Sequence, residues 1–298
     1  MPIAFVIRKS KSIVLPGFKG LALYEVLHFF KQQIQKIGLQ ERAAAISFNI
    51  VMSIPPGVIF LCTLIPYFPI SKQFKLALYS LVKDITPNQK VSSFILQFVR
   101  DFLETPRTGL LSFGFLLVIF YSSNAVIGMM RSFDRSIIQQ KKKNFIHYRW
   151  HAIRLTLILL GLVIATITLL VTQRAVENWL HIDSAVGKFF IQLLRWFCII
   201  ALTFYSIAFI YKYGPSVHKR WPLLSPGGIL ATTLMVCTTA IFGYWVNHFA
   251  SYNKLYGSIG TVLILMLLIF INSFVLLIGF ELNASITHLE KKEPSSFS

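Results

Sequence analysis

Several polar side chains of this chain interrupt long apolar stretches, and their spacing gathers them on single helix faces. Inside a membrane such side chains are costly, so they usually face the interior of a helix bundle or a water-filled path. The chemistry open to them is the binding and passage of a polar or anionic group. The candidate residues for a cavity or substrate path are Asn49, Asn124, Arg131, Asp134, Asn272, Glu281 and Asn283.

The longest polar stripe lies between residues 121 and 135. Its members follow one another at spacings of three and four residues, which places neighbours on the same helix face. They are Tyr121, Asn124, Gly128, Arg131 and Arg135. Asp134 stands beside the basic end of this stripe. The pattern predicts a polar path that ends in a positively charged mouth.

Glu281 is the one acidic residue that falls within a predicted membrane span or at its edge. It lies on the helix face opposite to Asn272 and Asn283. A carboxylate in this place needs a cation, because an unpaired charge is expensive away from water. We expect Arg131 or Arg135 to supply it. Glu281 is then either one half of a structural salt bridge or a relay for protons or coupled ions.

Two adjacent prolines, Pro55 and Pro56, lie in the middle of the first apolar stretch, which also carries Asn49 and Ser53. Each proline lacks the backbone N–H that a helix interior uses, so the pair predicts a kink or a break. A broken helix would line a substrate path, whereas a kink would be accommodated by neighbouring helices.

The composition places these residues in a membrane. Of the 298 residues, 55% are hydrophobic and only 13% are charged, with a mean hydropathy of +0.65. A soluble domain has about 25% charged residues, so a soluble enzyme and a disordered basic chain are excluded. Six stretches reach the roughly 20 mostly apolar residues that a span needs: 43–67, 109–130, 152–172, 189–211, 227–249 and 258–280. The expected fold is all-α, a polytopic membrane protein with six transmembrane helices and amphipathic interfacial helices.

The formal net charge of +18 indicates how the chain is inserted. Most lysines and arginines flank the same side of the six spans, and positive residues concentrate on the cytoplasmic side of membrane proteins. Both termini are therefore expected in the cytoplasm. Residues 1–42 are expected to form a cytoplasmic segment with an interfacial amphipathic helix, 43–284 the membrane domain and 285–298 a cytoplasmic tail.

The first outer connection, residues 68–108, is unusually long for a loop and spaces its apolar residues as a helix does. It predicts two amphipathic helices outside the membrane. These helices either lie on the lipid interface and pack on the bundle, or they form a cap over a cavity that opens outward.

Motifs of bond-making chemistry are missing from the sequence. It has no phosphate-binding loop, no dinucleotide fingerprint and no HExxH motif. His147 and His151 are four residues apart but flank Arg149 and lack an acidic partner, which favours a basic interfacial patch over a metal site. We expect no enzyme activity, no cofactor and no metal. Nucleic acid is not an expected partner either, because the cations follow the membrane-side rule.

Two sequence segments resemble the signature of the YihY/BrkB family. They are SYNKLYGSIG at 251–260 and GFELNA at 279–284, separated by a long apolar run. Weaker similarity extends from about residue 40 to 285 and includes ERAAAISF at 41–48. The chain departs from the family pattern at Asp134, where the family often has Asn, at Leu268, where it often has Trp, and at the added Pro55.

The resemblance implies a six-helix inner-membrane protein of bacteria with both termini in the cytoplasm. It implies no settled activity: the family has carried the label ribonuclease BN, an attribution regarded as mistaken, and some members are suspected of moving lipid-like substrates. It also singles out Tyr252, Asn253 and Tyr256 at the expected outer turn before the sixth span, where the tyrosines are equally natural interfacial anchors.

Three functional hypotheses remain open from the sequence. The first is a transporter or flippase-like permease for a lipid-like or small anionic substrate, with membrane lipids as partners. The second is a non-transporting envelope scaffold that binds partners through its outer helices. A remote third is a membrane-embedded hydrolase or ribonuclease. The sequence does not indicate an oligomeric state.

Overall fold

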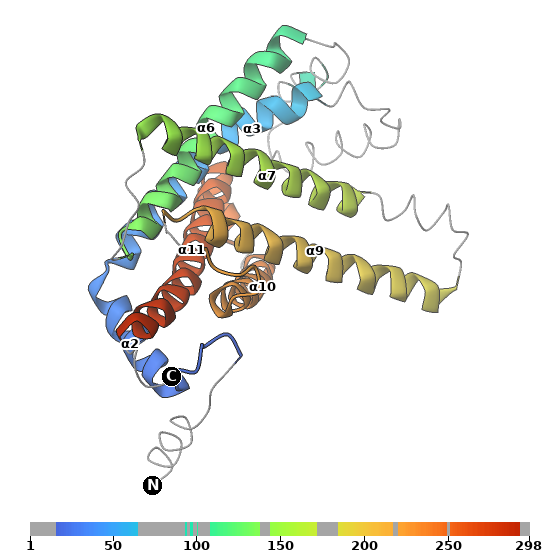
Figure 1. The fold of residues 1–298 in the computed structure, drawn as a ribbon. Helices are drawn as coiled ribbons and strands as arrows, with labels where there is room; N and C mark the ends of the chain where they lie inside the picture. Colours follow the sequence, from blue (N-terminus) through green and yellow to red (C-terminus); the bar gives the residue numbers. More distant parts are fainter. Residues whose placement is uncertain are drawn as a thin grey trace. The chain divides into compact units, whose positions relative to one another are not determined.

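Most of the chain that the computed structural model describes is helical. The described residues are 16–64, 93, 96–97, 100, 108–137, 144–171, 184–216, 220–248 and 251–292, and no strand occurs among them. The helices in this part are α2 (Leu23–Lys36), α3 (Leu39–Leu64), α6 (Thr108–Asp134), α7 (Phe145–Val171), α9 (Ala185–Tyr213), α10 (Pro226–His248) and α11 (Ser251–Lys292) (Figure 1). The prediction of an all-α chain is confirmed.

Six of these helices are long and apolar enough to cross a membrane. The candidate spans are Leu39–Phe60, Leu111–Asp134, Phe145–Thr166, Phe189–Tyr213, Pro226–Val246 and Val262–Lys292. The number and order of the predicted spans are confirmed, while their ends differ by several residues because the helices continue past the apolar windows. Only 11% to 33% of each window is buried by the rest of the protein. Most side chains of the spans are therefore left for a bilayer to cover.

The chain divides into two compact units. Unit 1 contains residues 1–48 and 123–298, and unit 2 contains residues 49–122. In unit 1, α7 packs against α9, α9 crosses α10, and α11 packs against both α10 and α2 (Figure 1). In unit 2, the later part of α3 meets the earlier part of α6. The Phe60 and Phe115 rings lie 5.5 Å apart there, and Gly114 faces the backbone of Phe60.

The amphipathic helix predicted before the first span is α2, and part of its apolar face is buried by the protein itself. Val26 is fully buried in a cluster with Phe18, Leu21, Leu282 and Ile286, which joins α2 to the C-terminal part of α11. Leu27 on the same helix remains 48% exposed. The helix is thus packed on α11, while the exposed side chain of Leu27 remains free to contact the membrane surface. The sequence pattern alone did not indicate the packing on α11.

The double proline does not break its helix. Helix α3 runs as one element from Leu39 to Leu64 with Pro55 and Pro56 inside it. Of the two interpretations left open by the sequence, a kink or a break, the continuous helix excludes the break. Neighbouring side-chain bonds to the backbone, such as Ser53 Oγ to the Ile50 carbonyl oxygen at 2.6 Å, are also found in this helix.

The SYNKLYGSIG segment is helical. Helix α11 begins at Ser251, so Tyr252, Asn253 and Tyr256 lie in its first two turns and not in a turn before it. Their side chains lie outside the described part, as does nearly all of the segment 68–108 that was predicted as two amphipathic helices.

Candidate functional site

Polar side chains gather at one end of unit 1, which we call the polar end. It comprises the C-terminal ends of α6, α9 and α11, the N-terminal ends of α7 and α10, and the first turn of α3. Three hydrogen-bond networks occupy it. Each contains one of the candidate residues that the sequence singled out: Glu281, Asp134 or Asn283.

The first network is a buried ion pair between Arg42 and Glu281. Arg42 Nη1 lies 3.1 Å from Glu281 Oε1, and the two side chains are 3% and 1% exposed. Ser136 Oγ accepts from Arg42 Nη2 at 2.8 Å and donates to Glu281 Oε1, while Arg42 Nη2 also donates to the Ser132 carbonyl oxygen. The pair connects the start of α3, the end of α6 and the last third of α11.

The cation that faces Glu281 is thus Arg42, and the expectation of Arg131 or Arg135 is wrong. Both of those arginines are exposed, Arg131 on α6 and Arg135 directly after its end. The true partners stand 239 residues apart in the chain, so no local pattern could have joined them. Burial makes the pairing necessary, because either charge without its partner would be buried away from water and would destabilise the fold.

The second network surrounds Asp134 at the end of α6. Its carboxylate accepts from the Ser216 backbone N–H at 2.7 Å and from Ser216 Oγ at 3.1 Å. The Tyr148 hydroxyl donates to the same carboxylate at 3.3 Å. Asp134 therefore connects α6 to the start of α7 and to the segment after α9.

Substitution of Asp134 should separate its acceptor role from its charge. Asp134→Ala leaves the Ser216 N–H without its acceptor, and we expect this to lower the free energy of unfolding by about 1–3 kcal/mol. Asp134→Asn keeps one carbonyl oxygen for the Ser216 N–H and should lose less than half as much. Thermal unfolding of the detergent-solubilised full chain measures both variants. Equal losses in the two variants would contradict this assignment.

The third network caps α10. Asn283 Oδ1 accepts from the Gly227 backbone N–H at 2.8 Å, and Asn283 Nδ2 donates to Ser225 Oγ at 2.9 Å. The first N–H groups of a helix lack intrahelical partners, and this side chain satisfies one of them. Gly227 and Gly279 face each other directly beneath it, with Tyr211 packed against Gly279. Asn283 thus fixes α11 against the start of α10.

The remaining candidates lie apart from these networks. Asn272 lies midway along α11, within 3.4 Å of the Thr238 and Thr239 hydroxyls of α10. Asn124 on α6 accepts from Arg149 Nη1 at 2.5 Å. Arg131 is exposed, and Asn49 is a half-buried residue of unit 2. The structure therefore assigns helix-to-helix contacts to Asn272 and Asn124, and it distributes the six candidates of unit 1 over separate contacts in the described part.

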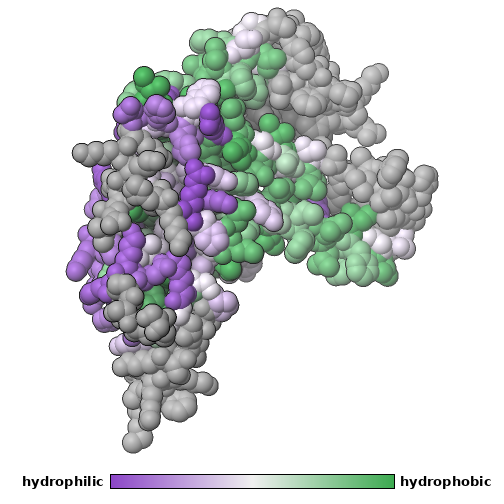
Figure 2. All heavy atoms as spheres, viewed as in Figure 1, coloured by the Kyte–Doolittle hydropathy of each residue, from purple (hydrophilic) through white to green (hydrophobic). Residues whose placement is uncertain are grey.

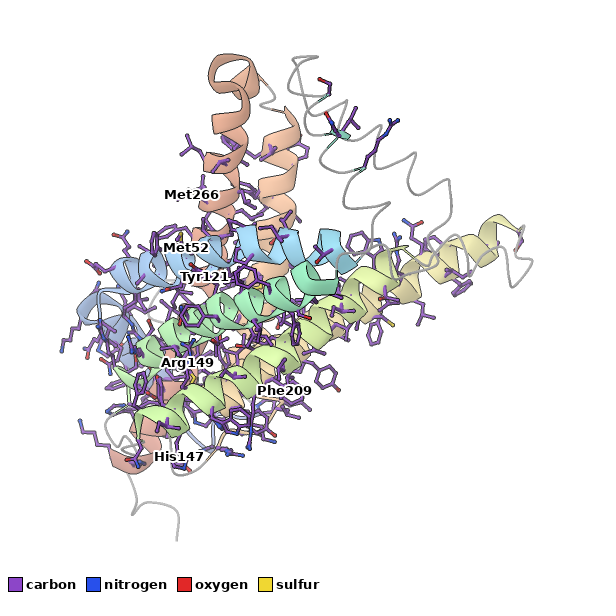
Figure 3. All side chains as sticks on the ribbon, turned by 90° about the horizontal axis from the view of Figure 1, so that it is seen from above. Met52, Tyr121, His147, Arg149, Phe209 and Met266 are labelled. Carbon is purple, nitrogen blue, oxygen red and sulfur yellow. The ribbon has the colours of Figure 1, made fainter. Side chains whose placement is uncertain are left out.

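A groove of about 330 Å³ does lie at the polar end, between α7 and α9. It is lined by His151, Arg154, Leu155, Ile158, Phe209, Tyr213 and Arg220, none of which belongs to the candidate set. Phe209 and Tyr213 stack with ring centroids 5.7 Å apart, and His151 Nε2 lies 3.0 Å from the Tyr213 carbonyl oxygen. Figure 3 labels Phe209 on this flank, with His147 and Arg149 near the beginning of α7.

The sequence did carry a signal for this groove. Residues 151, 154, 155 and 158 recur at the spacing i, i+3, i+4 and i+7 of one helix face, and Phe209 and Tyr213 are four apart. On sequence alone, its basic members belong to the excess of positive charge on one side of the spans. Nothing in the sequence showed that the two faces meet. Among the described residues no group of three His, Cys, Asp or Glu side chains gathers at a place that could hold a metal.

Comparison with known proteins decides the family. The family model described as "Virulence factor BrkB" matches residues 30–297. The chain belongs to the BrkB family. The resemblance seen in the SYN and GFELNA segments is thereby confirmed.

Relatives of this BrkB-family chain carry names that say little about activity. The "Putative ribonuclease-like protein YfkH" of Bacillus subtilis is 24% identical over 90% of this chain and 98% of that relative. A "UPF0761 membrane protein" of Aliivibrio fischeri is 23% identical over 90% of this chain and 84% of that relative. A protein of the same name from Tolumonas auensis is 26% identical over 44% of this chain and 45% of the relative. No solved structure matches the chain.

The GFELNA segment of this BrkB-family chain has a structural role at three of its positions. Gly279 allows the close approach of α10, Glu281 forms the buried ion pair with Arg42, and Asn283 caps α10. Glu281 faces α3 and the end of α6, whereas Gly279 and Asn283 face α10. Through these three residues, α11 contacts all three helices. The most specific part of the resemblance thus lies where the helices of the polar end are joined.

Proposed function

We propose that this BrkB-family membrane protein is a permease that moves a lipid-like or small anionic substrate across a bacterial inner membrane. The observation that carries this proposal is the groove between α7 and α9, which combines arginines with an apolar wall. A surface of that composition suits an amphipathic molecule, because an apolar part and an anionic part each find a complementary partner. We propose no catalytic role and no cofactor.

The proposed orientation places both termini and the polar end in the cytoplasm. It is supported by the excess of basic residues on that side of the spans and by the positive-inside rule. The ends of α6 and α7 bring Arg131, Arg135 and Arg149 to this side, and α2 adds Lys31 and Lys36. A groove in this place would receive its substrate from the inner leaflet or from the cytoplasm.

Transport by the purified full chain in liposomes tests the proposal. We expect reconstituted vesicles to move either a fluorescent phospholipid, followed by dithionite quenching, or a small anion, at least five-fold faster than protein-free vesicles. Arg154→Gln should slow this movement, whereas Lys31→Gln, which removes one exposed charge from α2, should not.

Vesicles that moved neither class of substrate across a broad panel would contradict the proposal. That outcome would favour the alternative of a non-transporting envelope scaffold. Transport that was equally fast in both variants would show that the groove takes no part in it.

A further inference from the structure

We propose that the groove between α7 and α9 binds the headgroup of an anionic phospholipid, with its phosphate between Arg154 and Arg220 and the start of its acyl chains along Ile158 and Phe209. This inference rests on the proposed function and names its substrate class. The occupant is a lipid of the surrounding membrane, as distinct from a free anion of the cytoplasm.

The two arginines of the groove have aromatic neighbours in place of acidic ones. The Arg154 guanidinium lies 5.4 Å from the centre of the Trp150 ring, and the Arg220 guanidinium lies 5.0 Å from the centre of the Tyr213 ring. Within the described part, no carboxylate lies within ion-pair distance of either guanidinium. Both are exposed. Two cations with donors to spare form a site for a phosphate, which accepts charge-assisted hydrogen bonds from arginine.

The other wall of the groove is apolar. Among the lining residues of α7, Leu155 is 2% exposed and Ile158 is 42% exposed. The stacked rings of Phe209 and Tyr213 close the opposite side. A free inorganic anion would gain nothing from this wall, whereas a lipid would place its glycerol and first methylene groups on it. The volume of about 330 Å³ suits a headgroup rather than a whole lipid.

The position of the groove along its helices matches the headgroup layer of one leaflet. Arg154 lies nine residues after Phe145, where the candidate span of α7 begins, and two residues inside the apolar stretch 152–172. Tyr213 ends the span of α9, so polar and apolar linings meet at this level. Long arginine side chains reach from such positions toward the headgroups. In Figure 2 hydrophobic residues cover the helices away from this end, and hydrophilic residues gather near it. An anionic leaflet surface would attract this end further.

Binding measured apart from transport tests this inference. The purified full chain in dodecyl maltoside would be titrated with fluorescently labelled phosphatidylglycerol, followed by competition with unlabelled phosphatidylglycerol, phosphatidylcholine or inorganic phosphate. We expect phosphatidylglycerol to compete at least ten-fold better than phosphatidylcholine. We expect millimolar phosphate not to displace the lipid. Equal competition by the two lipids, or displacement by phosphate at the concentration of the lipid, would overturn the inference.

Matched variants assign the binding to the groove. Arg154→Gln with Arg220→Gln should weaken phosphatidylglycerol binding at least ten-fold, whereas Lys31→Gln with Lys36→Gln removes the same charge from α2 and should leave it unchanged. Ile158→Asn should weaken binding several-fold, while Leu157→Asn, at a neighbouring residue that is 45% exposed and outside the groove, should not. Losses as large in the control variants would overturn the inference, because the effect would then be one of general charge or polarity.

The two proposals fail in different ways. If the groove variants lose lipid binding but no reconstituted sample transports anything, the permease proposal is wrong and the lipid site stands. If transport persists at full rate in variants that do not bind phosphatidylglycerol, the groove is not the site that binds the transported substrate. The permease proposal then stands.

Discussion

Replacing Arg42 with methionine should lower the free energy of unfolding by about 3–5 kcal/mol. The substitution leaves the buried Glu281 carboxylate without its cation, and among the described residues only the Ser136 hydroxyl still donates to it. It also removes the donor to the Ser132 carbonyl oxygen. Because this pair joins α3, α6 and α11, the loss should appear as a lower yield of folded protein and a lower midpoint in thermal unfolding of the solubilised full chain.

A double substitution separates the destabilisation caused by an unpaired buried charge from the stability that the intact ion pair contributes. Arg42→Met combined with Glu281→Met removes both charges, and replacing a whole buried pair by apolar residues is often close to neutral. We expect the double variant to recover most of the stability that Arg42→Met loses. Arg131→Met is the matched control, since that arginine is exposed on α6 and should change stability by no more than about 0.5 kcal/mol.

A double variant that is as unstable as Arg42→Met would contradict this account. It would mean that the two side chains contribute through packing or through other partners and not through their mutual charge. A control variant as unstable as Arg42→Met would mean that positive charge on α6 matters in general.

Adding a single methyl group at Gly279 should force α10 and α11 apart. A Cβ at this position would lie 2.5 Å from the Gly227 carbonyl oxygen and 2.6 Å from both Ala231 Cβ and Tyr211 Oη. Two of these three contacts are with backbone or with a side chain that cannot move aside. We expect Gly279→Ala to lower the free energy of unfolding by about 1–3 kcal/mol or more. Thermal unfolding of the solubilised chain measures the loss.

The same helix pair provides the control. Gly243 lies farther along α10, where a Cβ would meet nothing within 4 Å. Gly243→Ala should leave stability unchanged or raise it slightly, because alanine favours a helix over glycine. Gly227→Ala should be as harmful as Gly279→Ala, since its Cβ would collide with the Gly279 carbonyl oxygen. Normal stability of Gly279→Ala would show that the two helices are not in close contact.

These predictions assign a structural role to residues that the sequence presented as a substrate path. Glu281, Asp134 and Asn283 each hold two or three helix ends together through bonds to Arg42, Ser216 and Gly227. A polar residue inside a membrane helix must find partners, and for these three the partners are other parts of the protein. Glu281 and Asn283 are buried and Asp134 is half-buried, although spacing placed Glu281 and Asn283 on opposite helix faces. Spacing does not distinguish a cavity from a contact between helices.

The sequence by itself determined the six spans, their order and the class of protein, and the GFELNA and SYN segments identified the family. Hydropathy is a sum over about 20 consecutive residues, so it can be computed without knowing which helices are neighbours. The same locality explains what the sequence left open. The double proline allowed a kink or a break in α3, and whether a helix continues through prolines depends on what satisfies the freed carbonyl groups around it.

Only the tertiary structure decided which residues meet. The partner of Glu281 is 239 residues away, and the groove brings one face of α7 onto the last turns of α9 and the segment that follows. Each of these contacts depends on the packing of whole helices, in which a small residue such as Gly227 sets how closely two axes approach. Local spacing determines which face of a helix is polar or apolar. The arrangement of the helices determines what that face touches, because many packings satisfy the same set of faces.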